Sequence, residues 1–316
     1  MRQTLARLLL ILPGLCCADE AFHSGKVGTN GIEVVWSVPT NHWPSALWVY
    51  KVIPQHFAPP VISNLMALGS FTEGDRAKPY KRPAFRDEGL LIFRNKDETR
   101  QLVISPYLGW IQYRDEKARA ERKEHPQGVP GEEEALGLAV ENLRLFGVDR
   151  SHLSTKGNTG ELRTYKDLRR KSWYDKNEGK EIQEITSRGI FFIRRTDGID
   201  FSGIGPLGGV CISFANQAKI AELEIVWRGL EPFQLHKTVT AEEAVEAVQR
   251  GKAKWTPPLR DSSRIKRITV TEAMLFYRGA GGEDEQKFVE PFALLATTIE
   301  NGNTNVVANL EFQILR

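Results

Sequence analysis

Residues 210–227 read VCISFANQAKIAELEIVW, and this stretch decides the fold class that the sequence predicts. Two runs rich in β-branched and other apolar residues, 210–214 and 220–227, flank the more polar segment 215–219. Apolar runs on both sides of a short polar segment are typical of a β-hairpin. The stretch therefore predicts two antiparallel strands, and the apolar run 190–193 just before it predicts another strand.

A helix is expected after this hairpin. Thr240-Ala241-Glu242-Glu243 has the pattern of a capping box, and the helix that it opens should reach Gln249, with Gly251 just beyond its end. The tail then predicts strands at 268–277, 288–298 and 305–314. The C-terminal part is thus expected to combine an antiparallel sheet with a helix.

The N-terminal half shows a similar order. Strands are expected at 90–93 and 101–105, and the apolar residues of 132–146 recur at helical spacings of three and four. Three glutamates in the first turn of that helix suit the positive end of its dipole. We therefore predict an α+β fold of two domains, each an antiparallel sheet packed by a helix. The same order, a hairpin followed by a helix, occurs in both halves of the chain and suggests a duplicated unit. Glu-Glu-Ala stands at 133–135 and again at 242–244, but it is a common helix opening, so coincidence stays an alternative.

The length of 316 residues favours two domains. We place an N-terminal domain at 19–150, a polar linker region at 151–188 and a C-terminal domain at 189–316. Residues 1–18 have the basic start, short apolar run and small terminal residues of a signal peptide, with cleavage after Ala18. Lipidation of Cys16 or Cys17 is the alternative. Cleavage would leave Cys211 as the one cysteine, so no intramolecular disulfide is expected.

The composition and the net charge of the chain indicate which classes of partner to expect. Hydrophobic residues make up 41% and charged residues 26%, and the formal charge is only +3. A nearly balanced chain has no overall field to attract nucleic acid, so nucleic acid is not expected as a partner. No segment beyond the leader is long and apolar enough to span a bilayer. We expect an exported protein, periplasmic or extracellular, without an integral membrane span after signal cleavage.

The motifs give no support for a cofactor, a metal or a catalytic residue. Residues 203–208, GIGPLG, match G-x-G-x-x-G, but a proline interrupts them and a strand follows instead of a helix. None of the six histidines has the spacing of a metal ligand pair. Cys211 lies between apolar neighbours, which favours a buried, inert thiol over a nucleophile.

The candidate binding residues are Arg194, Arg195, Asp197, Asp200 and Trp227. Two acids beside two arginines at a strand-to-turn junction could act as an acid–base pair. The simpler interpretation is a turn held by side-chain hydrogen bonds plus a surface ion pair. Tryptophans such as Trp227 could stack on a sugar or a peptide, or could pack in the core.

The C-terminal part, from about Gly198 to Ile314, resembles a family of bacterial extracytoplasmic modules. It is similar in the order of its elements to the YycH/YycI-type regulators of sensor kinases and the wider PepSY-like domains. These elements are a glycine bend at 197–199, a hairpin around 214–216, Trp227, the 240–249 helix and the segments 275–277 and 290–292. Phe292 stands where that family often has tryptophan. The resemblance implies an α+β fold and a non-catalytic, binding or inhibitory role, with no catalytic residues to carry over.

These observations favour an exported, non-catalytic binding or regulatory protein of the bacterial envelope, which engages a protein or peptide partner. The alternatives are a secreted hydrolase acting on envelope polymers or peptides, and a carbohydrate-binding protein. Clustered carboxylates with shifted pKa values in a deep pocket would favour the hydrolase. Several coplanar, exposed tryptophans would favour carbohydrate binding.

Overall fold

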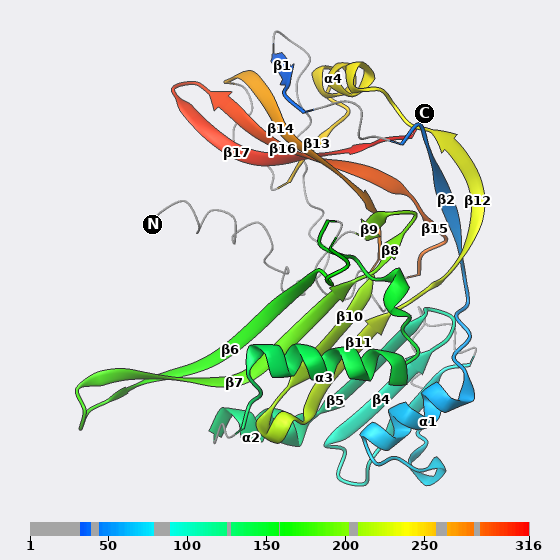
Figure 1. The fold of residues 1–316 in the computed structure, drawn as a ribbon, viewed down its shortest axis with the longest axis vertical. Helices are drawn as coiled ribbons and strands as arrows, with labels where there is room; N and C mark the ends of the chain where they lie inside the picture. Colours follow the sequence, from blue (N-terminus) through cyan, green and yellow to red (C-terminus); the bar gives the residue numbers. More distant parts are fainter. Residues whose placement is uncertain are drawn as a thin grey trace. The chain divides into compact units, whose positions relative to one another are not determined.

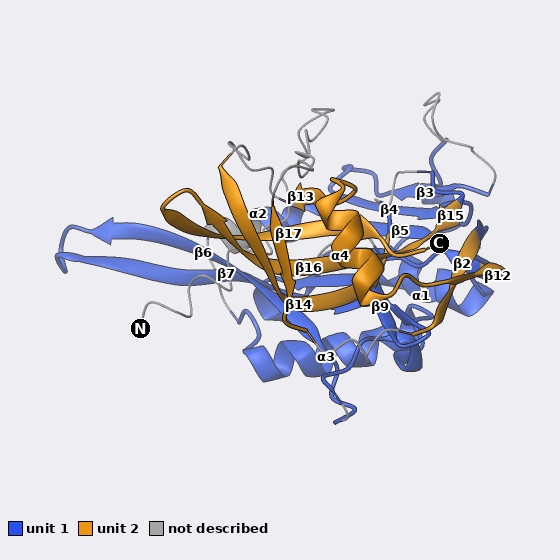
Figure 2. Ribbon diagram, turned by 90° about the horizontal axis from the view of Figure 1, so that it is seen from above, with its two compact units in different colours: residues 1–13, 52–230, 279–287 blue, residues 14–51, 231–278, 288–316 orange. Residues whose placement is uncertain are grey.

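The computed structural model of the chain describes residues 32–38, 44–78, 89–124, 128–157, 159–201, 208–256, 264–280 and 285–315. The signal peptide expected at 1–18 and most of the glycine-rich segment 203–208 lie outside these ranges. The chain divides into two compact units, each drawn from separate stretches of sequence (Figure 2). Of the described residues, unit 1 holds those within 52–230 and 279–287, and unit 2 holds those within 32–51, 231–278 and 288–315.

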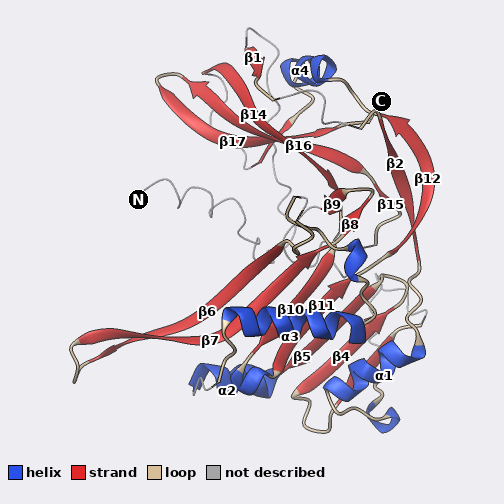
Figure 3. Ribbon diagram, viewed as in Figure 1, coloured by secondary structure: helices blue, strands red, loops and turns tan. Residues whose placement is uncertain are grey.

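The expected α+β class is wrong, because strands dominate the structure (Figure 3). Strands account for 52% of it and helices for 19%, and the described residues include only four α-helices. Two strands that the sequence did not predict are β6 (Thr164–Asp175), within the range expected as a polar linker, and β12 (Gly229–Lys237). Both are largely exposed, so they lack the apolar alternation by which a half-buried strand is recognised.

Unit 1 is built on a seven-stranded antiparallel sheet with the order β3-β4-β5-β11-β10-β7-β6. The hairpin predicted at 210–227 is confirmed and lies inside this sheet, with Val210 opposite Ile225. The two strands of this hairpin are β10 (Gly209–Phe214) and β11 (Ile220–Val226). The sheet also contains β6 and the strands β3 (Leu91–Arg94), β4 (Arg100–Ser105), β5 (Trp110–Asp115) and β7 (Lys180–Ile193).

Two helices cover one face of this sheet, α1 (Pro59–Leu68) and α3 (Glu132–Leu145) (Figure 1). Helix α3 confirms the helix predicted at 132–146, and Ala135, Ala139 and Leu143 are its buried residues, four apart. They pack with Leu65 of α1 and with strand residues such as Ile212 in one hydrophobic core. A shorter helix, α2 (Glu116–Glu124), directly follows β5. No helix of the described chain combines the length and the apolar character that crossing a bilayer requires.

Unit 2 contains a second sheet with the order β13-β17-β16-β14, and β1 runs parallel to β14. Helix α4 (Ala241–Gln249) confirms the helix expected after Thr240: Thr240 Oγ1 accepts from the Glu243 amide at 3.3 Å, and Glu243 Oε2 accepts from the Thr240 amide at 2.8 Å. The strands are β1 (Glu33–Trp36), β13 (Lys254–Thr256), β14 (Ile265–Tyr277), β16 (Pro291–Asn301) and β17 (Thr304–Gln313).

A small three-stranded sheet carries much of the exposed apolar surface of unit 2. Its order is β12-β2-β15, with β2 (Ala46–Ile53) in the middle and β15 (Phe288–Val289) on one side. Tyr50 of β2 lies opposite Val289 and is buried against Tyr277, with ring centroids 5.5 Å apart. One face of this sheet thereby packs on the core, and β12 is the outer strand on the side opposite β15.

Candidate functional site

Four of the five candidate binding residues lie at one short hairpin of unit 1. Strands β8 (Arg195–Thr196) and β9 (Ile199–Phe201) are antiparallel, with Arg195 opposite Asp200. Asp197 and Gly198 form the turn with φ values of 53° and 76°. Positive φ at both central residues is the two-residue hairpin turn for which Asp-Gly is strongly preferred. Asp197 therefore serves the turn, as the simpler interpretation of this sequence proposed.

Asp200 is the centre of a polar cluster. Its Oδ2 accepts from Ser154 Oγ at 2.8 Å and from Arg163 Nη1 at 3.0 Å, and its Oδ1 lies 3.7 Å from Arg195 Nε. Asp200 is only 9% exposed and Ser154 only 1%. The carboxylate thus ties β9 to the segment that holds Ser154 and Arg163, and the ion pair expected at the surface is instead centred on a buried acid.

Arg194 and Trp227 are also brought together. The guanidinium of Arg194 lies 4.7 Å from the ring centroid of Trp227 and 5.3 Å from that of Phe201, and its Nη1 donates to the Arg228 carbonyl at 2.6 Å. Arg194 and Trp227 are both buried, so the cation–π contacts form inside the unit. The five residues brace the hairpin, and a role for them in ligand binding stays a prediction.

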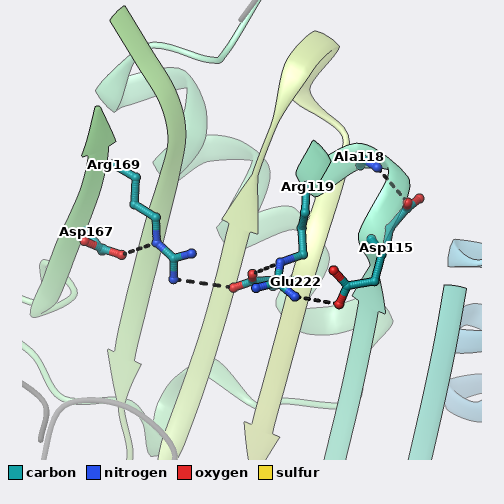
Figure 4. Close-up of polar contacts among 7 residues, drawn as sticks. Asp115, Ala118, Arg119, Asp167, Arg169 and Glu222 are labelled. Atoms are coloured by element: carbon teal, nitrogen blue, oxygen red, sulfur yellow. Dashed lines mark hydrogen bonds and ion pairs between the residues drawn. The ribbon is translucent and has the colours of Figure 1, made fainter. Parts of the chain in front are cut away.

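The face of the unit 1 sheet opposite α1 and α3 carries a network of charged side chains (Figure 4). Arg169 lies 3.3 Å from Asp167 and 3.7 Å from Glu222, and the second oxygen of Glu222 lies 2.6 Å from Arg119 Nε. These residues belong to β6, β11 and α2, which are far apart in the sequence. Each acid faces at least one arginine, so the network links three elements and its charges largely offset one another.

Cys211 lies on β10 and is only partly accessible. Burial, and then the carboxylates of Glu224 and Glu222, raise the pKa of its thiol well above the ordinary value of 9.0. The thiolate is the reactive form, so the position is unsuited to nucleophilic chemistry.

We expect iodoacetamide to alkylate Cys211 at pH 8 at least about 100-fold more slowly in the folded chain than in guanidinium, because the folded thiol stays protonated. Mass spectrometry of the Cys211 peptide measures this rate. The raised pKa also implies a pH effect, since above pH 9.0 the unfolded thiol ionises while the folded one does not. Stability should therefore fall as pH rises above that value, and Cys211→Ser should remove this part of the slope. Equal alkylation rates in the two states would contradict the assignment.

A hollow of about 280 Å³ opens in unit 2 beside the exposed strand β12. Two aromatic rings meet in it, Phe233 of β12 and Phe288 of β15, with centroids 5.0 Å apart. Phe233 is 56% exposed and Phe288 is 40% exposed, so both rings are accessible to solvent. The residues that line the hollow are Val49, Phe233, Gln234, His236, Phe288, Glu290, Gln313 and Leu315.

The outer edge of β12 borders this hollow. Strand β12 ends the order β12-β2-β15, and no other strand of the described chain pairs with it. Pro232 has no N–H, so it is tolerated in a strand where its nitrogen faces away from the neighbouring strand. Backbone groups of alternate residues point to the same side, so Gln234 should present its N–H and C=O at this outer edge. The edge from Pro232 to His236 together with the hollow is called the β12 site below.

The sequence prediction missed this site because its lining comes from four separate stretches of chain. One local signal was present, since Phe233 and Leu235 are two residues apart next to Pro232. Apolar residues at that spacing beside a proline indicate an edge strand. Leu235 is 52% exposed and extends the apolar surface along β12.

Carboxyl groups with shifted pKa values are dispersed among the described residues. Hydrogen bonds from neighbouring backbone or side-chain donors lower the pKa of each of five acids: Asp75, Asp97, Glu132, Asp149 and Glu242. They occupy separate turns and helix starts, where a charged acid stabilises the local backbone. Convergence of such acids on one pocket would favour the hydrolase, and these five acids do not converge.

Tryptophan exposure bears on the carbohydrate alternative. Within the described ranges Trp173 is the one exposed tryptophan, and Trp110, Trp227 and Trp255 are buried. Those ranges also hold no group of three or more side chains suited to a metal ion. In comparisons with known proteins, no family model and no curated protein matches this chain.

Proposed function

We propose that this is a binding protein that holds a segment of a partner polypeptide in extended conformation along the edge of β12. The observation that carries the proposal is an exposed strand edge beside a hollow that displays two aromatic rings. The leader expected at 1–18 would place this activity outside the cytoplasm, and we propose a regulatory role in the bacterial envelope.

Addition of a strand to a sheet edge explains how such a partner would be recognised. Main-chain hydrogen bonds to the edge provide affinity, and pockets for alternate side chains provide specificity. Gln234 would exchange backbone hydrogen bonds with the partner, and one partner side chain would enter the hollow between Phe233 and Phe288. A hollow of about 280 Å³ lies just below the range of roughly 300–1,000 Å³ typical of small-molecule sites. It therefore suits a single apolar or aromatic side chain.

The probe for this proposal is the blocked peptide acetyl-Lys-Thr-Val-Thr-Phe-Thr-Val-Lys-amide, titrated into the full chain in a calorimeter. We expect binding at micromolar concentrations, on the order of 10–100 µM. Replacing both Phe233 and Phe288 with alanine should weaken binding about tenfold or more, since aromatic side chains dominate such contacts. Val307→Ala is the matched control, because Val307 is a 70% exposed apolar residue on β17.

A backbone test separates edge pairing from simple apolar contact. Gln234→Pro removes the outward N–H, whereas Gln234→Ala removes the side chain and keeps that donor. Loss of one hydrogen bond, worth about 1 kcal/mol, should weaken the peptide about fivefold in the proline variant alone. Absence of binding by the unmodified chain, or equal affinities for the two variants, would count against strand addition at β12.

A further inference from the structure

The hairpin of β6 and β7 extends beyond the rest of the unit 1 sheet as a two-stranded arm (Figures 1 and 2). Strand β7 pairs with β10 only from Arg188 to Ile193, and the register of β6 against β7 shifts at Arg169/Arg170. Burial changes at the same place, because Thr186 and Ser187 are buried while Ile185 is exposed. Residues 170–185 are called the arm.

The arm exposes apolar side chains and strand edges. Tyr174 is 65% exposed, Trp173 and Ile185 are 36% exposed, and the β6 edge is the end of the sheet. A two-stranded ribbon is only marginally stable in water, and an unpaired edge is a template for another strand. We therefore expect the arm to be stabilised by a partner that pairs with its edge and covers its apolar side chains.

The charge balance of the arm argues against nucleic acid or an anionic membrane as that partner. Four basic residues are matched by four acidic ones: Arg170, Lys171, Lys176 and Lys180 against Asp175, Glu178, Glu181 and Glu184. Such polyanionic partners are attracted by an excess of lysine and arginine, which the arm lacks.

Two cross-strand pairs of opposite charge flank an apolar pair in the arm. Lys171 lies opposite Glu184, Trp173 opposite Ile182, and Asp175 opposite Lys180. Because residues two apart share a face of a strand, these three pairs lie on one face of the arm. The Lys171 ammonium lies 5.6 Å from the Trp173 ring centroid, consistent with a shared face.

We propose that the arm binds a second copy of this chain by antiparallel pairing of the two β6 edges about a two-fold axis at Trp173. This register places Lys171 opposite Asp175 of the other copy, and Asp175 opposite its Lys171. Across four strands the rows become Glu184–Lys171–Asp175–Lys180, with alternating charge, and Ile182–Trp173–Trp173–Ile182, which is apolar. Opposite charges and aromatic pairs directly across a sheet are stabilising.

The registers whose axis lies two residues from Trp173 are less favourable. An axis at Lys171 would place two lysines opposite each other, and an axis at Asp175 would oppose two aspartates, which destabilises a strand pair. A two-fold interface uses the same surface on both copies, so one self-complementary edge suffices for a closed dimer.

Sedimentation velocity of the full chain at about 1–100 µM and low salt tests the proposal. We expect a reversible dimer whose dissociation constant rises about tenfold or more in Lys171→Glu, because each copy then faces an acid with an acid. Asp175→Lys should have a similar effect, and the double variant should restore dimerisation. Lys266→Glu, the same charge change on an exposed residue of β14, is the control and should dimerise normally.

The rescue distinguishes contact between copies from damage within one arm. Both single variants also disturb pairs inside their own arm, with Glu184 or Lys180, and the double variant keeps both disturbances. Recovery of the dimer therefore requires pairing between copies. A monomer at all concentrations, or a dimer that Lys171→Glu leaves unchanged, would overturn the proposal. So would binding of a monomeric chain to phosphatidylglycerol vesicles through the arm.

Discussion

Replacing Asp200 with alanine is expected to lower the free energy of unfolding by about 2–4 kcal/mol. The substitution leaves the Ser154 hydroxyl, which is 1% exposed, without the carboxylate that accepts from it at 2.8 Å. It also removes the acid that faces Arg163 and Arg195. Removing one partner of a buried charged cluster costs more than the contact contributed, because the remaining groups stay desolvated.

Guanidinium unfolding followed by circular dichroism measures this loss. Asp197→Asn in the same hairpin is the matched control, since asparagine tolerates the positive φ of the turn. The control should change stability by less than about 1 kcal/mol. If Asp200→Ala unfolded at the denaturant concentration of the unmodified chain, the cluster would not brace the hairpin, and a ligand-binding role for Asp200 would regain weight.

The sequence identified the hairpin residues but not their partners. Asp197 and Gly198 carry a local turn preference, and this is why their neighbourhood could be recognised. Ser154 and Arg163 lie 46 and 37 residues from Asp200, and nothing in their own neighbourhoods points to that acid. Only the tertiary fold converts an expected surface ion pair into a buried one.

Elements with one buried face could be predicted, and elements exposed on both faces could not. Strand β10 alternates, with Val210, Ile212 and Phe214 in the core, and α3 repeats its buried residues every four positions. Strands β6 and β12 have mostly exposed side chains and carry no such period. Missing these two strands understated the strand content, and this contributed to the wrong fold class.

The β12 site illustrates the same limit for function. Val49, Phe233, Phe288 and Leu315 come from four stretches of chain, and each alone reads as an ordinary apolar residue. Their convergence depends on the strand order β12-β2-β15, which sequence patterns do not specify. The arm differs, because its charges are close in sequence and become informative once the register of β6 against β7 is known.

Gly109→Ala is expected to destabilise the chain by about 3–5 kcal/mol or to prevent folding. Gly109 has φ = +59°, a conformation that costs an L-residue about 1–2 kcal/mol. A Cβ atom there would lie 2.6 Å from Arg228 Cα and 2.7 Å from Arg228 N. The Gly109 carbonyl also accepts from the Trp227 amide at 2.6 Å, so the two backbones cannot separate without losing this bond.

Gly137→Ala is the matched control, and its effect should have the opposite sign. Gly137 lies in α3, is exposed, and has no atom within 4 Å of an added Cβ, so alanine should stabilise the helix by about 1 kcal/mol. The same substitution thus measures the effect of a close backbone contact at Gly109 and the effect of backbone entropy at Gly137. Thermal unfolding of the two variants measures the change in stability. If Gly109→Ala were as stable as the unmodified chain, the contact between this turn and residues 227–228 would be wrong. The position of Trp227 against Arg194 depends on that contact and would then need revision.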